Sequence, residues 1–200
     1  MRIIIRCVML VMLFSISGCI SYSLVAAGPL MVGGLQLDPG ATWNLAAPQL
    51  TPSMRKGGQV WTKDGLLLDR LMIIQGVPDG QAIFKDSTGT MALPIFRASM
   101  LPNEVEELTE NSIVKLFGEG QVAVSTSNLR PHRFGDDRGV LFNINVSVSD
   151  APDYRGLAGA FIANGAFYLM LYIAADPYYY DKHLAEVEAL ITGARLAGPA

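Results

Sequence analysis

The residues whose types and spacing promise covalent chemistry are Ile16, Ser17, Gly18 and Cys19. A cysteine sulfur is a good nucleophile once deprotonated, so it can accept a covalent group. Small residues directly before a cleavage site fit the tight pocket of a signal peptidase. The pattern therefore predicts cleavage in front of Cys19 and attachment, through a thioether at its sulfur, of a lipid that carries palmitate-type acyl chains.

The segment ahead of that motif is typical of an export signal. It has Arg2 and Arg6 near its start and an apolar run over residues 7–16, which is shorter than the about 20 residues that a membrane-spanning helix needs. The motif resembles the lipobox of bacterial lipoproteins, which implies that residues 1–18 are a signal peptide that is removed. An ordinary secretory signal is the alternative. Because Ile20 rather than an aspartate follows the cysteine, analogy with Gram-negative sorting favours the outer membrane.

Length and composition limit what kind of protein follows the predicted signal. About 180 residues are enough for one domain with its own core, and we expect a lipidated N-terminus and tether over residues 19–28 and a single globular domain over residues 29–197. The formal net charge of the chain is −3 and no basic run occurs, which argues against nucleic acid as a partner. Cys7 is lost with the signal and Cys19 is modified, so the predicted mature chain forms no internal disulfide.

Two helices are predicted from apolar residues at helical spacing. The first runs from Asn103 to about Phe117, with Asn103 as its cap and Glu106 completing a capping box. The second runs from about Tyr180 to Arg195.

Strands are predicted where the period changes to two. In residues 140–149 apolar and polar side chains alternate, whereas residues 166–175 are apolar on both faces and are expected to be central. Asp64-Gly65 is typical of a hairpin turn. We therefore predict an α+β fold, an antiparallel sheet of meandering strands with two helices packed on it, most economically on one face.

Several motifs together resemble known proteins. Trp61–Gly65, Arg130-Pro131 and Tyr179-Tyr180 resemble those of a group of small uncharacterised proteobacterial lipoproteins. The order of the elements is also similar to the Mog1/PsbP-like fold, which implies an α/β/α sandwich. Proteins of that fold act as accessory or binding factors more than as enzymes, so the resemblance implies a binding role.

The first candidate site is polar and lies beside an aromatic residue. Asp64, Asp69 and Arg70 follow Trp61 closely and invite a functional interpretation. A hairpin with an Asp-Gly turn and a buried tryptophan explains the same residues, and we favour it. Neighbours on a strand face opposite ways, so Asp69 and Arg70 are not expected to pair.

Metal sites and known catalytic motifs are not predicted. The acidic run from Gly135 to Gly139 lacks the length of a calcium loop and is interpreted as a hairpin connection. The only histidines are His132 and His183, too few for a zinc site without a free cysteine; His183 is expected to form a surface pair with Glu186. No nucleophile elbow, phosphate loop or dinucleotide fingerprint occurs. We predict no cofactor, no metal, no catalytic residues and no enzymatic activity.

Tyr178, Tyr179 and Tyr180 form the most unusual cluster of the predicted domain. Tyrosines are enriched where surfaces bind partners, so Tyr178 and Tyr179 are a candidate partner surface; the alternative is that the cluster fastens the last helix. We expect an outer-membrane lipoprotein, anchored by lipid on Cys19 and facing the periplasm, that serves as an accessory or protein-binding module of the envelope. The alternative is a small-ligand or lipid-binding protein with a pocket between sheet and helices, and an enzyme of unknown class ranks third.

Overall fold

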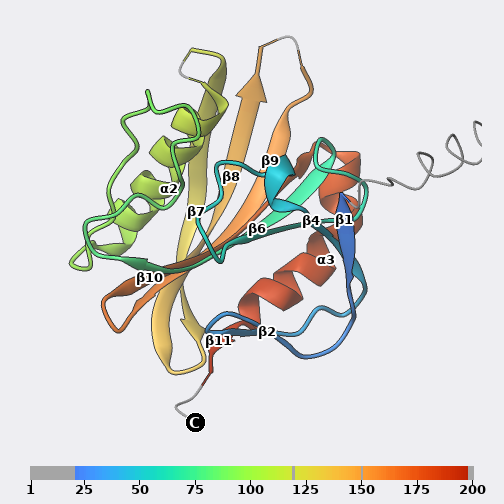
Figure 1. Ribbon diagram of the computed structural model, residues 1–200, viewed down its shortest axis with the longest axis horizontal. Coiled ribbons are helices and arrows are strands. Elements are labelled where there is room, and N and C mark those ends of the chain that lie inside the picture. The colour runs from blue at the N-terminus through green and yellow to red at the C-terminus, as the bar shows by residue number, and fades with distance from the viewer. Residues whose placement is uncertain (1–20, 119, 150, 198–200) are drawn as a thin grey trace, which may run out of the picture.

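The computed structural model describes residues 21–118, 120–149 and 151–197, so the predicted signal peptide and Cys19 lie outside the described residues. In these ranges one large antiparallel sheet of eight strands dominates the fold, in the order β1-β4-β5-β6-β10-β9-β8-β7 (Figure 1). Its strands are β1 (Tyr22–Val25), β4 (Trp43–Ala46), β5 (Gln59–Thr62), β6 (Asp69–Pro78), β7 (Val122–Phe134), β8 (Asp137–Val148), β9 (Tyr154–Ala163) and β10 (Ala166–Ala175). The predicted antiparallel α+β fold is confirmed.

Four further elements complete the described fold. A small second sheet consists of β2 (Leu30–Val32), β3 (Leu35–Leu37) and β11 (Arg195–Leu196). A short 3-10 helix, η2, spans Pro48–Leu50. The two α-helices are α2 (Pro102–Phe117) and α3 (Tyr178–Thr192).

The two helices cover opposite faces of the large sheet. Successive residues of a strand point to opposite faces, and Phe142 and Leu171 belong to the same apolar cluster as Val105 of α2. Their neighbours Leu141 and Met170 belong instead to the cluster that contains α3. Figure 1 accordingly shows the helices on either side of the sheet. The one-face arrangement is wrong and the α/β/α sandwich is confirmed, because β10 is apolar on both sides and needs cover on both.

The two strands that periodicity predicted are present in the structure. Residues 140–149 correspond to β8, and β10 lies between β6 and β9 inside the sheet, as its two apolar faces predict. Asp64-Gly65 joins β5 to β6, with Gly65 at φ 116°, a backbone conformation that glycine adopts easily. The run Gly135–Gly139 contains the turn from β7 to β8, so the hairpin interpretation is confirmed.

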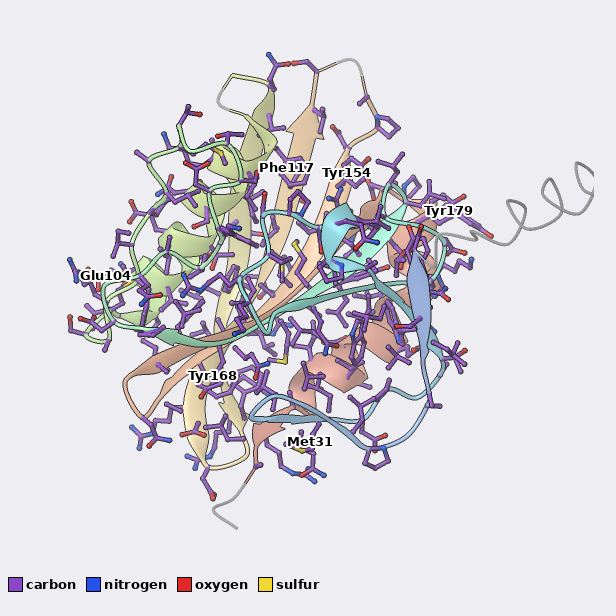
Figure 2. The ribbon with its side chains drawn as sticks, viewed as in Figure 1. Met31, Glu104, Phe117, Tyr154, Tyr168 and Tyr179 are labelled. Carbon is purple, nitrogen blue, oxygen red and sulfur yellow. The ribbon has the colours of Figure 1, made fainter. Side chains whose placement is uncertain are left out.

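The start of α2 differs from its prediction. The helix begins at Pro102 rather than after Asn103, with Leu101 as the cap residue. The backbone N–H of Leu101 donates to the carboxylate of Glu104 at 2.6 Å, so Glu104 rather than Glu106 closes the cap. Proline suits the first helical position because its missing N–H has no partner there anyway. Glu104 and Phe117 mark the first and last turns of α2 in Figure 2.

The segment expected to be a tether contains a strand. Tyr22–Val25 forms β1 and pairs with β4 at one edge of the large sheet. The carbonyl of Ser21 also accepts a hydrogen bond from the N–H of Ala47 at 2.9 Å. Part of the predicted tether over residues 19–28 therefore belongs to the large sheet.

Candidate functional site

The turn between β5 and β6 is organised by one buried carboxylate. Asp69 is 1% exposed and accepts three hydrogen bonds, from Thr62 Oγ1 at 2.9 Å, from the Lys63 N–H at 2.9 Å and from the Asp64 N–H at 2.7 Å. Trp61 is fully buried on the same hairpin. Asp69 is therefore a structural residue of the turn, as the hairpin interpretation predicted.

The same turn is joined to α3 by charged pairs. The carboxylate of Asp64 lies 2.7 Å from Lys182 Nζ and 2.7 Å from His183 Nε2. Partial desolvation disfavours the ionised carboxyl, but hydrogen bonds from Lys182 and His183 outweigh it and lower the pKa of Asp64. The predicted surface pair of His183 with Glu186 is wrong, because Glu186 binds Lys63 Nζ at 2.5 Å instead. These contacts fix the helix to the hairpin.

The tyrosine cluster opens α3 and divides into an inner and an outer part. Tyr180 is 4% exposed and stacks on Tyr172 with ring centroids 5.9 Å apart, and burial raises the pKa of both phenols. The guanidinium of Arg155 lies 4.3 Å from the Tyr180 ring centroid. Tyr178 is 66% exposed, and its ring packs edge-on against that of Tyr179, which is labelled in Figure 2. Tyr180 thus packs α3 against the sheet, while the ring of Tyr178 is largely exposed to solvent.

Neither histidine joins a metal-binding group. His132 Nε2 lies 3.0 Å from the carbonyl of Thr192 and its ring packs edge-on against Phe134. Within residues 21–118, 120–149 and 151–197, no group of three or more His, Cys, Asp or Glu side chains has the arrangement of a metal site. Both histidines have structural partners there.

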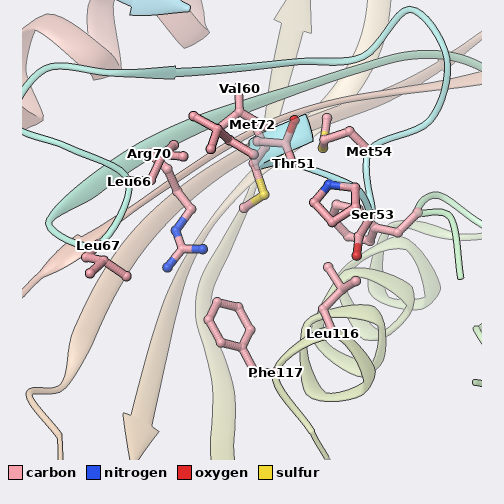
Figure 3. A pocket seen from close by; sticks show the side chains of 13 residues that line it. Thr51, Ser53, Met54, Val60, Leu66, Leu67, Arg70, Met72, Leu116 and Phe117 are labelled. Atoms are coloured by element: carbon pink, nitrogen blue, oxygen red, sulfur yellow. The ribbon is translucent and has the colours of Figure 1, made fainter. Parts of the chain in front are cut away.

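A pocket of about 450 Å³ lies on the α2 side of the sheet. Its floor is formed by Val60 of β5 and by Arg70 and Met72 of β6, and one wall by Leu116 and Phe117 at the end of α2. Figure 3 shows these side chains around a common space. We call this space the β6–α2 pocket.

Two irregular segments close the rest of the β6–α2 pocket. The first is Leu50, the last residue of η2, together with residues 51–54 that follow it. The second is the turn between β5 and β6, from which Leu66 and Leu67 reach the pocket (Figure 3). Leu67 is 78% exposed, which places it at the rim. The carboxylate of Asp69 holds this turn, so it also holds one side of the pocket.

Arg70 is the single charged residue among those that line the β6–α2 pocket. Its guanidinium carbon lies 5.1 Å from the centroid of the Phe117 ring, and burial lowers the pKa of the guanidinium against the opposing effects of Tyr154 and Asp69. Arg70 and Asp69 face opposite sides of β6, as predicted. Sequence reasoning considered Arg70 as a member of a polar site with Asp64 and Asp69. The structure instead places it in the β6–α2 pocket beside Met72, two residues further along the same face of β6.

The comparisons with known proteins identify a fold. The sequence matches no known family profile and no curated protein. Its structure is similar to the solution structure of cyanobacterial PsbP (CyanoP) from Synechocystis sp. PCC 6803, with a TM-score of 0.56 and 12% sequence identity over 92% of this chain and 96% of that chain. In the described residues, no helix is long and apolar enough to span a membrane. At this identity the likeness establishes the PsbP-like fold that the order of the elements predicted.

Proposed function

We propose that this protein is a non-enzymatic lipoprotein of the bacterial envelope, anchored through Cys19 in the outer membrane and facing the periplasm, that binds a small apolar ligand in the β6–α2 pocket. The observation that carries the proposal is the pocket itself, whose volume of about 450 Å³ falls in the range of small-molecule sites. Its lining is mostly aliphatic and aromatic, with few polar groups, as such sites usually are.

The composition of the pocket favours binding over catalysis. General acid–base chemistry needs a titratable side chain within hydrogen-bond reach of the substrate. The described residues that line the β6–α2 pocket include no histidine, carboxylate, cysteine or lysine, and its hydroxyl groups belong to Thr51 and Ser53. These hydroxyls have no adjacent base in the lining, so a nucleophilic role has no support.

Anchoring at Cys19 has a direct consequence for how the domain sits. Cys19 lies three residues before Tyr22, where β1 begins, and three residues span at most about 11 Å. Tyr22 and Leu24 of β1 are 41% and 72% exposed. A lipid on Cys19 therefore holds this edge of the sheet close to the bilayer.

Lipid attachment is tested by metabolic labelling. We expect the wild-type protein to incorporate a labelled fatty acid and Cys19→Ala to incorporate none, since the thiol of Cys19 is the acceptor of the lipid. Undiminished labelling of the variant would contradict the anchor.

Ligand binding is tested in place, with the full-length anchored protein in phosphatidylcholine vesicles. The probe is a neutral alkyl alcohol that carries a photoreactive diazirine, and mass spectrometry maps the labelled peptides. We expect labelling of residues 50–54 and of the peptide that contains Leu116, and its loss in Ser53→Trp, because the indole occupies the space. Ser127→Trp, on the exposed side of β7, is the matched control. Unlabelled pocket peptides in the wild type would refute the proposed function.

A protein partner is the second candidate function, and the exposure of Tyr178 favours it. Lys182 Nζ lies 5.9 Å from its ring centroid, so the outer tyrosine and a cation are presented together. Aromatic and basic groups of this kind are common in interfaces. Cross-linking in cells that yields one stoichiometric envelope protein, lost in Tyr178→Ala, would favour this candidate.

A further inference from the structure

The setting of Arg70 differs from that of two other partly buried cations of the fold. Lys63 and Arg155 each have a carboxylate within 4.0 Å, Glu186 for the first and Asp176 for the second. In the part of the chain that the structure describes, Arg70 has no such ion pair, and its side chain instead contacts the ring of Phe117. A guanidinium is always charged in proteins, so the pocket holds a half-buried cation without an ion-pair partner.

The guanidinium nitrogens of Arg70 are accessible rather than enclosed. Among the described residues every fully buried side-chain nitrogen or oxygen has a hydrogen-bond partner, whereas the contact that the Arg70 guanidinium makes is the one with the Phe117 ring. The end of α2 lies nearby and carries a partial negative charge that favours a cation. No hydrogen bond from Arg70 to a carbonyl of α2 is present among the described residues, so the donors of the guanidinium stay available to the pocket, into which the side chain extends (Figure 3).

We propose that the ligand of the β6–α2 pocket is a single-chain amphiphile whose carboxylate binds Arg70 and whose alkyl chain lies along Met72 and Leu116. This inference rests on the proposed function and specifies its ligand. The planar guanidinium matches a carboxylate through two parallel hydrogen bonds. One cation balances one negative charge, whereas a phosphate monoester would bring about two.

The volume of the pocket suits one chain. At about 30 Å³ for each water-sized unit, a cavity of about 450 Å³ holds on the order of 15 non-hydrogen atoms. That is a chain of the length of dodecanoate with its head group. A diacyl lipid is far larger, so the pocket selects a single chain.

The bilayer is the source of this ligand. Ser21 is hydrogen-bonded to Ala47, and Leu50, three residues further along, lines the pocket. The predicted lipid on Cys19 therefore lies at most a few residues' length from the pocket rim, and the exposed side chain of Leu67 continues the apolar surface outward. A fatty acid in the membrane has a short apolar path to Arg70.

The test compares matched photoreactive probes with the same alkyl chain: a carboxylic acid, its methyl ester and the neutral alcohol. The full-length anchored protein is labelled in phosphatidylcholine vesicles at neutral pH, and labelling of the pocket peptides is normalised to the amount of each probe in the membrane. We expect the acid to label about tenfold more than the ester or the alcohol, because a hydrogen-bonded ion pair of this kind is worth more than one factor of ten.

Variants assign that preference to Arg70. In Arg70→Met we expect labelling by the acid to fall to the level of the alcohol while the alcohol still labels, and in Arg70→Lys we expect a smaller preference for the acid. Arg97→Met is the control, since Arg97 is exposed and lies 3.8 Å from Asp79. The comparison of acid with ester in the wild type decides the question even where a variant does not fold.

The outcomes separate the two proposals. Equal labelling by acid, ester and alcohol in the wild type overturns the carboxylate ligand and leaves the apolar pocket in place. Absence of labelling by every probe at the pocket peptides overturns the proposed function as well. Labelling by all three probes with a preference for the acid, and loss of that preference in Arg70→Met, supports both.

Discussion

The Asp69→Asn substitution tests whether one buried carboxylate holds the turn that borders the pocket. Oδ1 of Asp69 accepts from Thr62 Oγ1 and from the Asp64 N–H, and Oδ2 accepts from the Lys63 N–H. An asparagine keeps one oxygen and replaces the other by an NH₂ group, which is itself a donor. The most favourable orientation of the asparagine amide therefore keeps the two hydrogen bonds to Oδ1. Its NH₂ group then faces the backbone N–H of Lys63, so that two donors meet without an acceptor.

The magnitude follows from that geometry. A hydrogen bond to a charged group is worth about 1.5–3 kcal/mol, and a donor left without an acceptor costs about 1–3 kcal/mol. Because Asp69 is 1% exposed, solvent does not replace the lost partner. We expect a loss of about 3 kcal/mol of the free energy of unfolding, which for a domain of this size lowers Tm by about 10 °C.

The assay is thermal unfolding of the full-length protein followed by circular dichroism. Asp136→Asn is the control, because Asp136 is an exposed residue of the turn between β7 and β8, and its effect is expected to stay within about 0.5 kcal/mol. A fall in Tm of less than about 2 °C for Asp69→Asn would refute the argument that this carboxylate organises the turn.

Four further substitutions probe the attachment of α3. A Cβ at Gly159 would lie 2.4 Å from Cγ2 of Ile191, so Gly159→Ala should cost about 1–3 kcal/mol in chemical unfolding; an unchanged midpoint would show that the helix yields freely. The pKa of Asp64 is lowered from 3.8, so its contribution is present above that pH and is lost as the pH falls through the folded value. Tm of the wild type should therefore fall more steeply on acidification below about pH 4 than Tm of Asp64→Asn, and parallel curves would contradict this. Tyr180→Ala should cost about 3 kcal/mol and Tyr178→Ala less than about 0.5 kcal/mol in thermal unfolding; equal losses would show that both rings fasten the helix.

Periodicity correctly predicted two strands, one that is apolar on one face only and one that is apolar on both faces. The alternation in residues 140–149 and the two apolar faces of residues 166–175 each led to the correct strand and, for the latter, to its central place. The cap of α2 was misplaced because Asn103 and Glu106 match the capping pattern, whereas the leucine that caps the helix has no side-chain acceptor and is not recognised by it. Only the backbone geometry set by Pro102 distinguishes the two.

Contacts between residues far apart in the sequence could not be predicted from local sequence patterns. Asp64 and His183 are far apart in the sequence, and nothing near either residue indicates that they meet. His183 was assigned to Glu186 because the spacing on one helix allowed it. In the structure each residue instead has a partner from the turn between β5 and β6, Asp64 for His183 and Lys63 for Glu186. The pocket was expected only in general terms, between sheet and helices, since its lining comes from distant segments.

The asymmetry of the two sheet faces explains why a pocket forms where it does. A helix covers a width of about 10 Å, or roughly two strands at about 4.8 Å each, and Thr126 of β7, which donates to Glu110, shows that α2 lies at the β7 side. Irregular chain must cover β5 and β6 instead, and loops pack side chains less regularly than helices do. The other face has α3 and the second sheet together. The presence of Arg70 without an ion pair on the floor of this pocket is therefore a property of the sequence rather than of the architecture: a leucine there would fill the same floor without carrying a charge.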